Sequence, residues 1–216
     1  MSVNPDPHRD AFLEAAARDL AGEFVGVFDP ETVRHHVYLA LEMLGTPVGA
    51  TFRDAFARRF ARDLLRSAAR WKGAAPMTTP LVLFVCVHNA GRSQMAAAFA
   101  EQLGRGRIEV LSAGSAPSDS IHPNVHAVMK EVGIDLSAAY PKRLSEDFVR
   151  AADVVITMGC GDACPVFVGK RYEDWEIEDP KGEPLDKVRA IRDVIRVRVE
   201  SLLAVLGVSV AARGAT

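Results

Sequence analysis

This chain of 216 residues has few cysteines, only short apolar runs and little net charge. Its longest apolar stretches, near residues 81–87 and 202–212, fall short of the roughly 20 residues that span a bilayer, so we expect no membrane contact. The N-terminal residues lack a hydrophobic signal segment, which predicts a cytoplasmic protein. A net charge of −2 argues against nucleic acid as the main partner, because such proteins usually carry a basic excess.

The few cysteines also limit the kind of protein. There are three, and in a compartment that keeps thiols reduced they indicate chemistry or core filling and not a disulfide framework. The hydrophobic content of 49% is enough for a buried core. We therefore expect a globular protein.

The chain is organised around residues 82–95, an apolar run that ends at Cys86 and passes through a polar loop into a helix beginning at Arg92. Such a loop can direct its backbone N–H groups at a tetrahedral anion while a guanidinium grips two of the anion's oxygens. The predicted oxyanion-binding residues are Val87, His88, Asn89, Ala90, Gly91 and Arg92.

Cys86 then lies beneath the anion and is the predicted nucleophile. Helix N-termini and nearby cations lower a thiol pKa from about 8.5 to roughly 3.5–7.5, so we expect a thiolate. Ser93 is placed to hydrogen-bond that sulfur, and Asn89 tolerates a left-handed backbone. The alternative is a buried strand cysteine beside a surface arginine. A nucleotide-binding Walker loop is excluded, because no Gly-Lys-Ser or Gly-Lys-Thr follows four residues after a glycine.

Residues 1–74 have the pattern of three helices, near 7–24, 30–44 and 50–71, with Asp29 as the N-cap of the second. The third carries an apolar ridge of Phe52, Phe56, Phe60 and Leu64. So small a bundle is marginally stable alone, so we expect it to form a homodimer through these helices, with packing inside the chain as the alternative. The third helix is also rich in arginine, but ten basic and ten acidic residues balance over 1–74, which favours an acid-paired surface over DNA binding.

After a linker at 75–80, strands and helices alternate over 81–216, which predicts a parallel, doubly wound sheet with helices on both faces. We expect strands at 81–86, 108–112, 153–158 and 172–177. The expected helices are 92–103, 123–132, a short one before the third strand, and 185–206. Ligands bind such sheets at the carboxyl ends of the strands.

Three further candidates follow strands at that same edge. Cys160 and Cys164 are four residues apart after the third predicted strand, a spacing that can close into a disulfide, and we expect them to act as a thiol relay with Cys86. Plain core filling is the alternative. Asp179 follows the fourth strand and is the predicted general acid, with a turn aspartate as the alternative.

The histidines carry weaker signals. His122 and His126 are spaced like metal ligands on a helix, but the glutamate of a His-Glu-x-x-His motif and a third ligand are missing. We therefore interpret His122 as a helix-start residue and His126 as a surface or packing residue. His88 lies inside the loop, and its side chain either alters the electrostatic field of the loop or points to solvent. We predict no metal site.

Taken together, the segments 86–95, 112–114, 157–160, 164–165 and 179–180 resemble the thioredoxin-coupled arsenate reductases, which share the fold of the low-molecular-weight protein tyrosine phosphatases. The resemblance covers about residues 81–206 and implies a flavodoxin-like four-stranded parallel sheet. The segment before it resembles a three-helix extension of some actinobacterial members that is thought to dimerise. Several relatives hold potassium under the loop; Asn89 and Ser112 match that ligand set, but Ala97 replaces its glutamate, so we expect no potassium.

The resemblance implies the reduction of arsenate to arsenite. Cys86 is the implied nucleophile, Arg92 the oxyanion grip, Ser93 the thiolate support, Asp179 the acid, and Cys160 and Cys164 the relay thiols, with no bound cofactor and with thioredoxin or a similar thiol as electron donor. A phosphatase of the same fold is the first alternative, although residues 179–186 offer no aromatic pair to stack a phosphotyrosine ring. An arsenic or redox sensor without turnover is the second.

Overall fold

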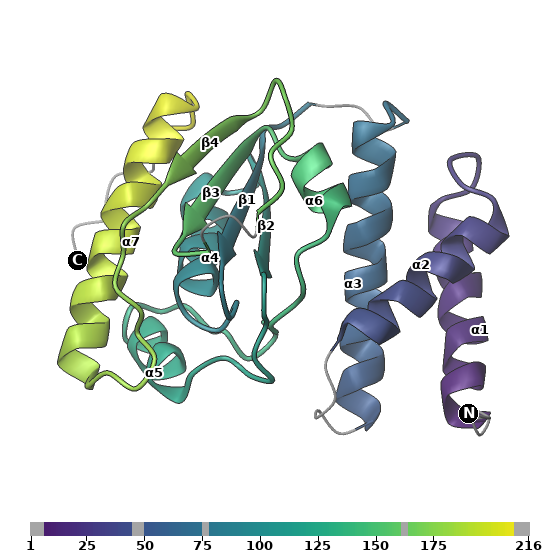
Figure 1. The fold of residues 1–216 in the computed structure, drawn as a ribbon, viewed down its shortest axis with the longest axis horizontal. Coiled ribbons are helices and arrows are strands. Elements are labelled where there is room, and N and C mark those ends of the chain that lie inside the picture. Colours follow the sequence, from purple (N-terminus) through teal and green to yellow (C-terminus); the bar gives the residue numbers. More distant parts are fainter. Residues whose placement is uncertain (1–6, 45–49, 75–77, 161–163, 210–216) are drawn as a thin grey trace. The chain divides into compact units, whose positions relative to one another are not determined.

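The computed structural model describes residues 7–44, 50–74, 78–160 and 164–209. The chain forms two compact units, residues 1–76 and 77–216 (Figure 1). The predicted linker 75–80 falls at their boundary, and its first three residues lie outside the described parts. Within the described residues, no helix has both the length and the apolar content that a membrane crossing needs.

The first unit is a bundle of three helices, α1 (Pro7–Glu23), α2 (Pro30–Met43) and α3 (Ala50–Trp71), as predicted. Helix α2 packs against both of the others. Its start is fixed by Asp29, whose Oδ1 accepts a hydrogen bond from the Thr32 backbone N–H at 2.8 Å, while Pro30 occupies the first turn. The cap predicted from the sequence is therefore confirmed.

Part of the apolar ridge of α3 is already buried in the single chain. Phe60 and Leu64 are almost fully covered, whereas the side chain of Phe52 lies outside the described residues. Two arginines of the same helix pair with acids of α1: Arg58 with Asp19, and Arg62 with Glu23. For these arginines the acid-paired surface is confirmed.

The second unit holds a four-stranded, fully parallel sheet in the order β2-β1-β3-β4. Its strands are β1 (Leu81–Cys86), β2 (Glu109–Gly114), β3 (Val154–Met158) and β4 (Arg171–Asp174). Its helices are α4 (Arg92–Gly104), α5 (Pro123–Glu131), α6 (Glu146–Ala151) and α7 (Leu185–Val205).

Helices cover both faces of this sheet. Alternate residues of a strand point to opposite faces: Val82, Phe84 and Cys86 face a core built with α4, α5 and α7. Leu83 and Val85 are equally buried on the other face, where α6 contacts β1. Figure 1 shows α6 and α7 on opposite sides of the sheet.

The strand order places the candidate residues at one edge. After β1 the chain adds β2 on one side and later β3 on the other, so the order reverses between β1 and β3, where ligands of such sheets bind. Cys86 pairs with Met158 of β3 and with Gly114 of β2. Cys160 therefore follows two residues after the direct neighbour of the predicted nucleophile.

Most predicted boundaries lie within two residues of the observed ones, and β4 is the exception. We expected the strand to reach residue 177, but it ends at Asp174. Its neighbour β3 ends at Met158, where Gly159 takes a left-handed φ of 73° and turns the chain away. Beyond Trp175, whose N–H still bonds Thr157 O, β4 has no strand left to pair with. Asp179 consequently lies on a connection five residues beyond the strand.

Candidate active site

The loop after β1 is held from outside through its carbonyl groups. In a planar trans peptide the N–H points opposite to the C=O, so carbonyls engaged outside the loop turn the N–H groups inward. The carbonyl groups of residues 86–91 each accept a hydrogen bond. The donors are the backbone N–H groups of Ser115, Ala116, Ser118, His122 and Met95 and the side chain of Gln94. Oxyanion binding by this loop stays a prediction.

The sulfur of Cys86 lies at the base of the loop, buried and within reach of two donors. The backbone N–H of Asn89 donates to Sγ at 3.2 Å, and the Ser93 hydroxyl lies 3.0 Å from it. Asn89 Nδ2 donates to Ser93 Oγ at 2.8 Å. Because that hydroxyl already accepts from Asn89, its own proton is available for the sulfur.

Asn89 is the residue that ties this network together. It has the left-handed backbone that its residue type allows, with φ at 46°. Its Oδ1 accepts from Gln94 Nε2 at 3.1 Å and from the Lys142 backbone N–H at 2.9 Å. Those two bonds fix the amide orientation, so that Nδ2 faces Ser93. The sequence indicated Asn89 and Ser93, but it gave no signal for Gln94 or Lys142.

Gly114, at the end of β2, allows this loop to come close. A Cβ on Gly114 would lie 2.7 Å from Val87 O and 2.9 Å from Asn89 N. Both atoms belong to the loop backbone and cannot swing aside like a flexible side chain. Only glycine fits there. The sequence had placed residues 112–114 in the family resemblance, but it did not reveal this close approach.

Arg92 and Asp179 meet directly. Arg92 is buried, and its Nη2 donates to Asp179 Oδ2 at 2.6 Å while Nη1 donates to the Ile177 carbonyl at 3.1 Å. The other carboxyl oxygen of Asp179 accepts from the Lys181 backbone N–H at 3.0 Å. The structure thus brings the predicted grip and the predicted acid together. It also shows a contact that the sequence did not suggest, with the guanidinium holding a protein carboxylate.

Two histidines flank this pair. Nδ1 of His88 lies 3.9 Å from Asp179 Oδ2, so this nitrogen faces the site although the side chain is 31% exposed. His122 is the N-cap residue of α5, which agrees with a helix-start role, and its backbone N–H bonds Ala90 O at 3.0 Å. Burial lowers the pKa of His122, and the charge of Asp179 only partly offsets this. His122 is therefore uncharged at neutral pH.

Cys160 and Cys164 are both buried, free thiols. Burial raises the pKa of Cys160, and the nearby Cys86 and Asp174 add to the rise against backbone hydrogen bonds that lower it. Burial, with a smaller contribution from Cys160, raises the pKa of Cys164 to about 11. In this reduced arrangement both thiols stay protonated at neutral pH. The residues between them, 161–163, lie outside the described parts.

The segment after Cys164 is anchored by a residue that the sequence did not single out. The hydroxyl of Tyr172 on β4 accepts from the Phe167 backbone N–H at 2.9 Å and donates to the Pro165 carbonyl at 3.3 Å. Arg150 of α6 lies over the Phe167 ring, 4.1 Å from its centroid. Cys164 is therefore held at the edge of the sheet by contacts on its C-terminal side.

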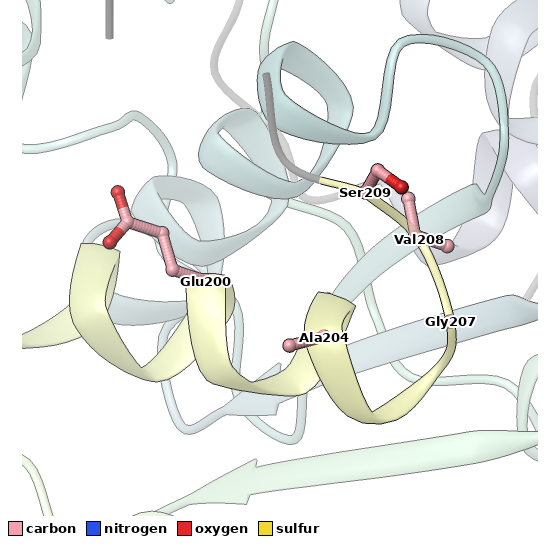
Figure 2. A pocket seen from close by; sticks show the side chains of 5 residues that line it. All are labelled: Glu200, Ala204, Gly207, Val208 and Ser209. Carbon is pink, nitrogen blue, oxygen red and sulfur yellow. The ribbon is translucent and has the colours of Figure 1, made fainter. Parts of the chain in front are cut away.

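A separate pocket of about 450 Å³ lies at the end of α7 (Figure 2). Its lining residues are Glu200, Ala204, Gly207, Val208 and Ser209. None of them is a predicted site residue, and none is a cysteine. The chemistry-bearing residues gather instead at the loop after β1.

Comparison with known proteins agrees with this arrangement. The family model described as low molecular weight phosphotyrosine protein phosphatase matches residues 81–212. The chain belongs to this family. The resemblance expected from the sequence is thereby confirmed for the fold of the second unit.

Within the family, several relatives are arsenate reductases. A putative arsenate reductase of Halobacterium salinarum is 44% identical over 128 residues, which are 55% of this chain and 87% of the relative. The glutaredoxin arsenate reductase of Synechocystis is 43% identical over 126 residues, covering 57% of this chain and 95% of the relative.

A solved structure extends the similarity to the helical unit. The thioredoxin-dependent arsenate reductase of Corynebacterium glutamicum is 40% identical, with a TM-score of 0.83 over 91% of this chain and 97% of that protein. An arginine phosphatase of Geobacillus stearothermophilus is 28% identical, with a TM-score of 0.52 over 59% of this chain and 93% of that chain. The family fold therefore serves both reductases and phosphatases, and the site residues must distinguish them.

Proposed function

We propose that this chain reduces arsenate to arsenite with Cys86, Cys160 and Cys164 acting in sequence. One observation carries the proposal: a buried Cys86 lies at the base of a loop whose carbonyl groups accept hydrogen bonds from outside it, and two more cysteines follow β3, the strand that pairs directly with β1. A phosphatase needs only the first thiol.

In the first step the loop binds arsenate through its backbone N–H groups and the Arg92 guanidinium. Cys86 Sγ attacks arsenic, an S–As bond forms and an As–O bond breaks, and Asp179, acting in its protonated form in this step, supplies the proton with which the oxygen leaves as water. The Ser93 hydroxyl and the Asn89 N–H stabilise the sulfur before the attack. A general acid of this kind contributes about 10²–10⁴ in rate.

In the second step Cys160 attacks the sulfur of Cys86. An S–S bond forms, the S–As bond breaks, and arsenic keeps the electron pair and leaves as arsenite. Cys164 then attacks Cys160, so that Cys86 is released and the disulfide passes to Cys160 and Cys164. Because both relay thiols are buried and protonated in the reduced arrangement, their segment must rearrange before each becomes a thiolate.

A dithiol donor then reduces the Cys160–Cys164 disulfide. The Corynebacterium relative is thioredoxin-dependent, which supports thioredoxin as the donor, whereas the Synechocystis relative is a glutaredoxin arsenate reductase. Thioredoxin is our first expectation, and a small thiol with glutaredoxin is the alternative. We also place the reaction in the cytoplasm, where thiols are kept reduced.

The test measures arsenate-dependent NADPH oxidation with thioredoxin and its reductase, and in parallel with glutaredoxin, glutathione and glutathione reductase. Wild type should turn over, while Cys160→Ser and Cys164→Ser should lose turnover yet still bind inorganic phosphate. Turnover that survives both substitutions refutes the relay. Hydrolysis of p-nitrophenyl phosphate without arsenate turnover would favour the phosphatase, and neither activity would favour the sensor.

We also propose that the helical unit forms a homodimer. Since Phe60 and Leu64 are already covered in one chain, the contact must use other apolar residues; Val25, Tyr38 and Trp71 are exposed. Sedimentation equilibrium of the full chain tests this, and the mass of a single chain at all concentrations would refute it.

A further inference from the structure

The side chain of His88 contains a polar atom that backbone oxyanion binding does not use. Nδ1 is shielded from solvent, and no described residue forms a hydrogen bond with it. A buried nitrogen without a hydrogen bond is unfavourable and uncommon in folded proteins. The ring is nevertheless held half-buried beside the loop, 3.9 Å from Asp179 Oδ2.

The two oxygens of Asp179 are bound differently. Oδ1 accepts from the backbone N–H of Lys181, two residues further along the same segment. Oδ2 accepts from the side chain of Arg92 at 2.6 Å. The position of Oδ2 therefore depends on where the guanidinium points.

An oxyanion in the loop changes the contact between Arg92 and Asp179 Oδ2. The guanidinium that grips two oxygens of the anion turns its N–H groups to the anion, and Asp179 Oδ2 loses its donor. Oδ2 also carries the second ion-pair contact of Asp179, the one with His88. A small rotation of the imidazole ring would shorten the 3.9 Å separation between His88 Nδ1 and Asp179 Oδ2 to hydrogen-bonding distance.

We propose that His88 is a positioning residue that takes over Asp179 Oδ2 from Arg92 when an oxyanion binds. Its Nδ1–H donates to Oδ2 and holds the carboxyl group beside the departing oxygen. The inference rests on the proposed function, because it concerns the acid of that reaction. His88 itself forms no covalent bond and keeps its proton.

The neighbouring titratable groups do not take the place of His88 as the donor to Asp179 Oδ2. Apart from Arg92, two titratable residues lie near this pair: His122, on which Asp179, His88 and Lys181 all act electrostatically, and Lys181 itself. His122 is uncharged at neutral pH and is tied to the loop through its backbone. Lys181 already contacts Asp179 through its main chain, at the other oxygen.

The experiment compares His88→Leu, which removes the donor, with His88→Asn, whose Nδ2 stands close to the position of Nδ1. Each is also made in the Asp179→Asn background, and His126→Leu is the matched control in the same unit. Two quantities are measured at neutral pH: the single-turnover rate of arsenate-dependent thiol loss, and the Kd of inorganic phosphate.

Because the hydrogen bond forms in the oxyanion complex, we expect His88→Leu to slow the single turnover and to raise the phosphate Kd, each by up to about tenfold, and His88→Asn to restore most of both. In the Asp179→Asn background His88→Leu should have no further effect, as expected for two residues that act as a unit. An unchanged rate, or an equal loss in both backgrounds, overturns the inference.

If wild type does not reduce arsenate, the proposed function fails, and a crystal structure with inorganic phosphate then decides the role of His88. A distance between Nδ1 and Oδ2 within about 3.2 Å, with Arg92 on the phosphate, supports it. A distance still beyond about 3.5 Å with Arg92 on the phosphate overturns it.

Discussion

Replacing Asp179 by asparagine should strengthen oxyanion binding while it slows the chemistry. In the structure Arg92 Nη2 donates to the Asp179 carboxylate at 2.6 Å, so an oxyanion has to compete with a protein carboxylate for the same guanidinium. Asparagine keeps the shape of the side chain but removes its charge. It therefore weakens the competitor and removes the repulsion between the carboxylate and the incoming anion.

The size of the effect follows from the exposure of the pair. A hydrogen bond to a charged group contributes roughly 1.5–3 kcal/mol when it is well shielded. The side chain of Asp179 is 38% exposed, although that of Arg92 is only 9% exposed, so solvent screening reduces the contribution to about 1 kcal/mol. We expect the phosphate Kd to fall about fivefold. The single-turnover rate with arsenate should fall by roughly 10²–10³, because the general acid is lost.

Titration calorimetry with inorganic phosphate measures the first effect, and quenched-flow counting of free thiols after mixing with arsenate measures the second. Asp193→Asn is the matched control, since it removes a carboxylate paired with a different arginine, Arg192. Phosphate that binds no more tightly to Asp179→Asn than to wild type and the control would refute the competition between carboxylate and oxyanion.

Three further outcomes follow from close contacts and burial. Gly114→Ala should weaken phosphate binding at least about tenfold and lower stability by roughly 1–3 kcal/mol in thermal unfolding, because its Cβ meets the loop backbone at 2.7 Å; unchanged affinity would contradict the close approach. Gly159→Ala should raise KM for arsenate more than it lowers kcat, since a Cβ there lies 2.8 Å from Arg92 Nη1 at a backbone φ of 73°; a pure kcat effect would argue against displacement of the guanidinium. In the reduced protein Cys164 should react with iodoacetamide at pH 8 roughly a hundredfold more slowly than free cysteine, because burial raises its pKa to about 11 and only the thiolate reacts. Its rate, followed by mass spectrometry, should climb as the pH approaches that pKa, and a rate equal to that of free cysteine would contradict the burial.

Local patterns were sufficient to predict the scaffold of the site. The apolar run ending at Cys86, and the polar loop before Arg92, fall within fifteen residues, so their chemistry is visible in the sequence. The alternation of strands and helices then predicts a parallel sheet, and the carboxyl-end rule places Cys160 at the same edge as Cys86. The pairing of Cys86 with Met158 agrees with that placement.

The contacts that orient the site are long-range, and the sequence did not reveal them. Gln94 Nε2 bonds both Asn89 and the carbonyl of Tyr140, and the Lys142 N–H bonds the same asparagine from 53 residues away. Periodicity reports which face of an element is buried, but it carries no information on which distant backbone group meets a given side chain. The early end of β4 was also missed because it depends on a long-range contact, namely the point at which its neighbour β3 ends.

Arg92 links the three parts of the proposed reaction through direct contacts. Its side chain begins at the loop proposed to bind the oxyanion, and its two terminal nitrogens hold Asp179 and Ile177 on the connection after β4. Its Nη1 also lies so close to Gly159 that a Cβ there would come within 2.8 Å of it. Gly159 precedes the first relay thiol, Cys160. An oxyanion that draws the guanidinium toward the loop therefore acts at once on the acid and on the segment that must rearrange for the relay. For the proposed reaction we therefore expect the anion to bind first, the acid to be released second and the relay thiol to be exposed last.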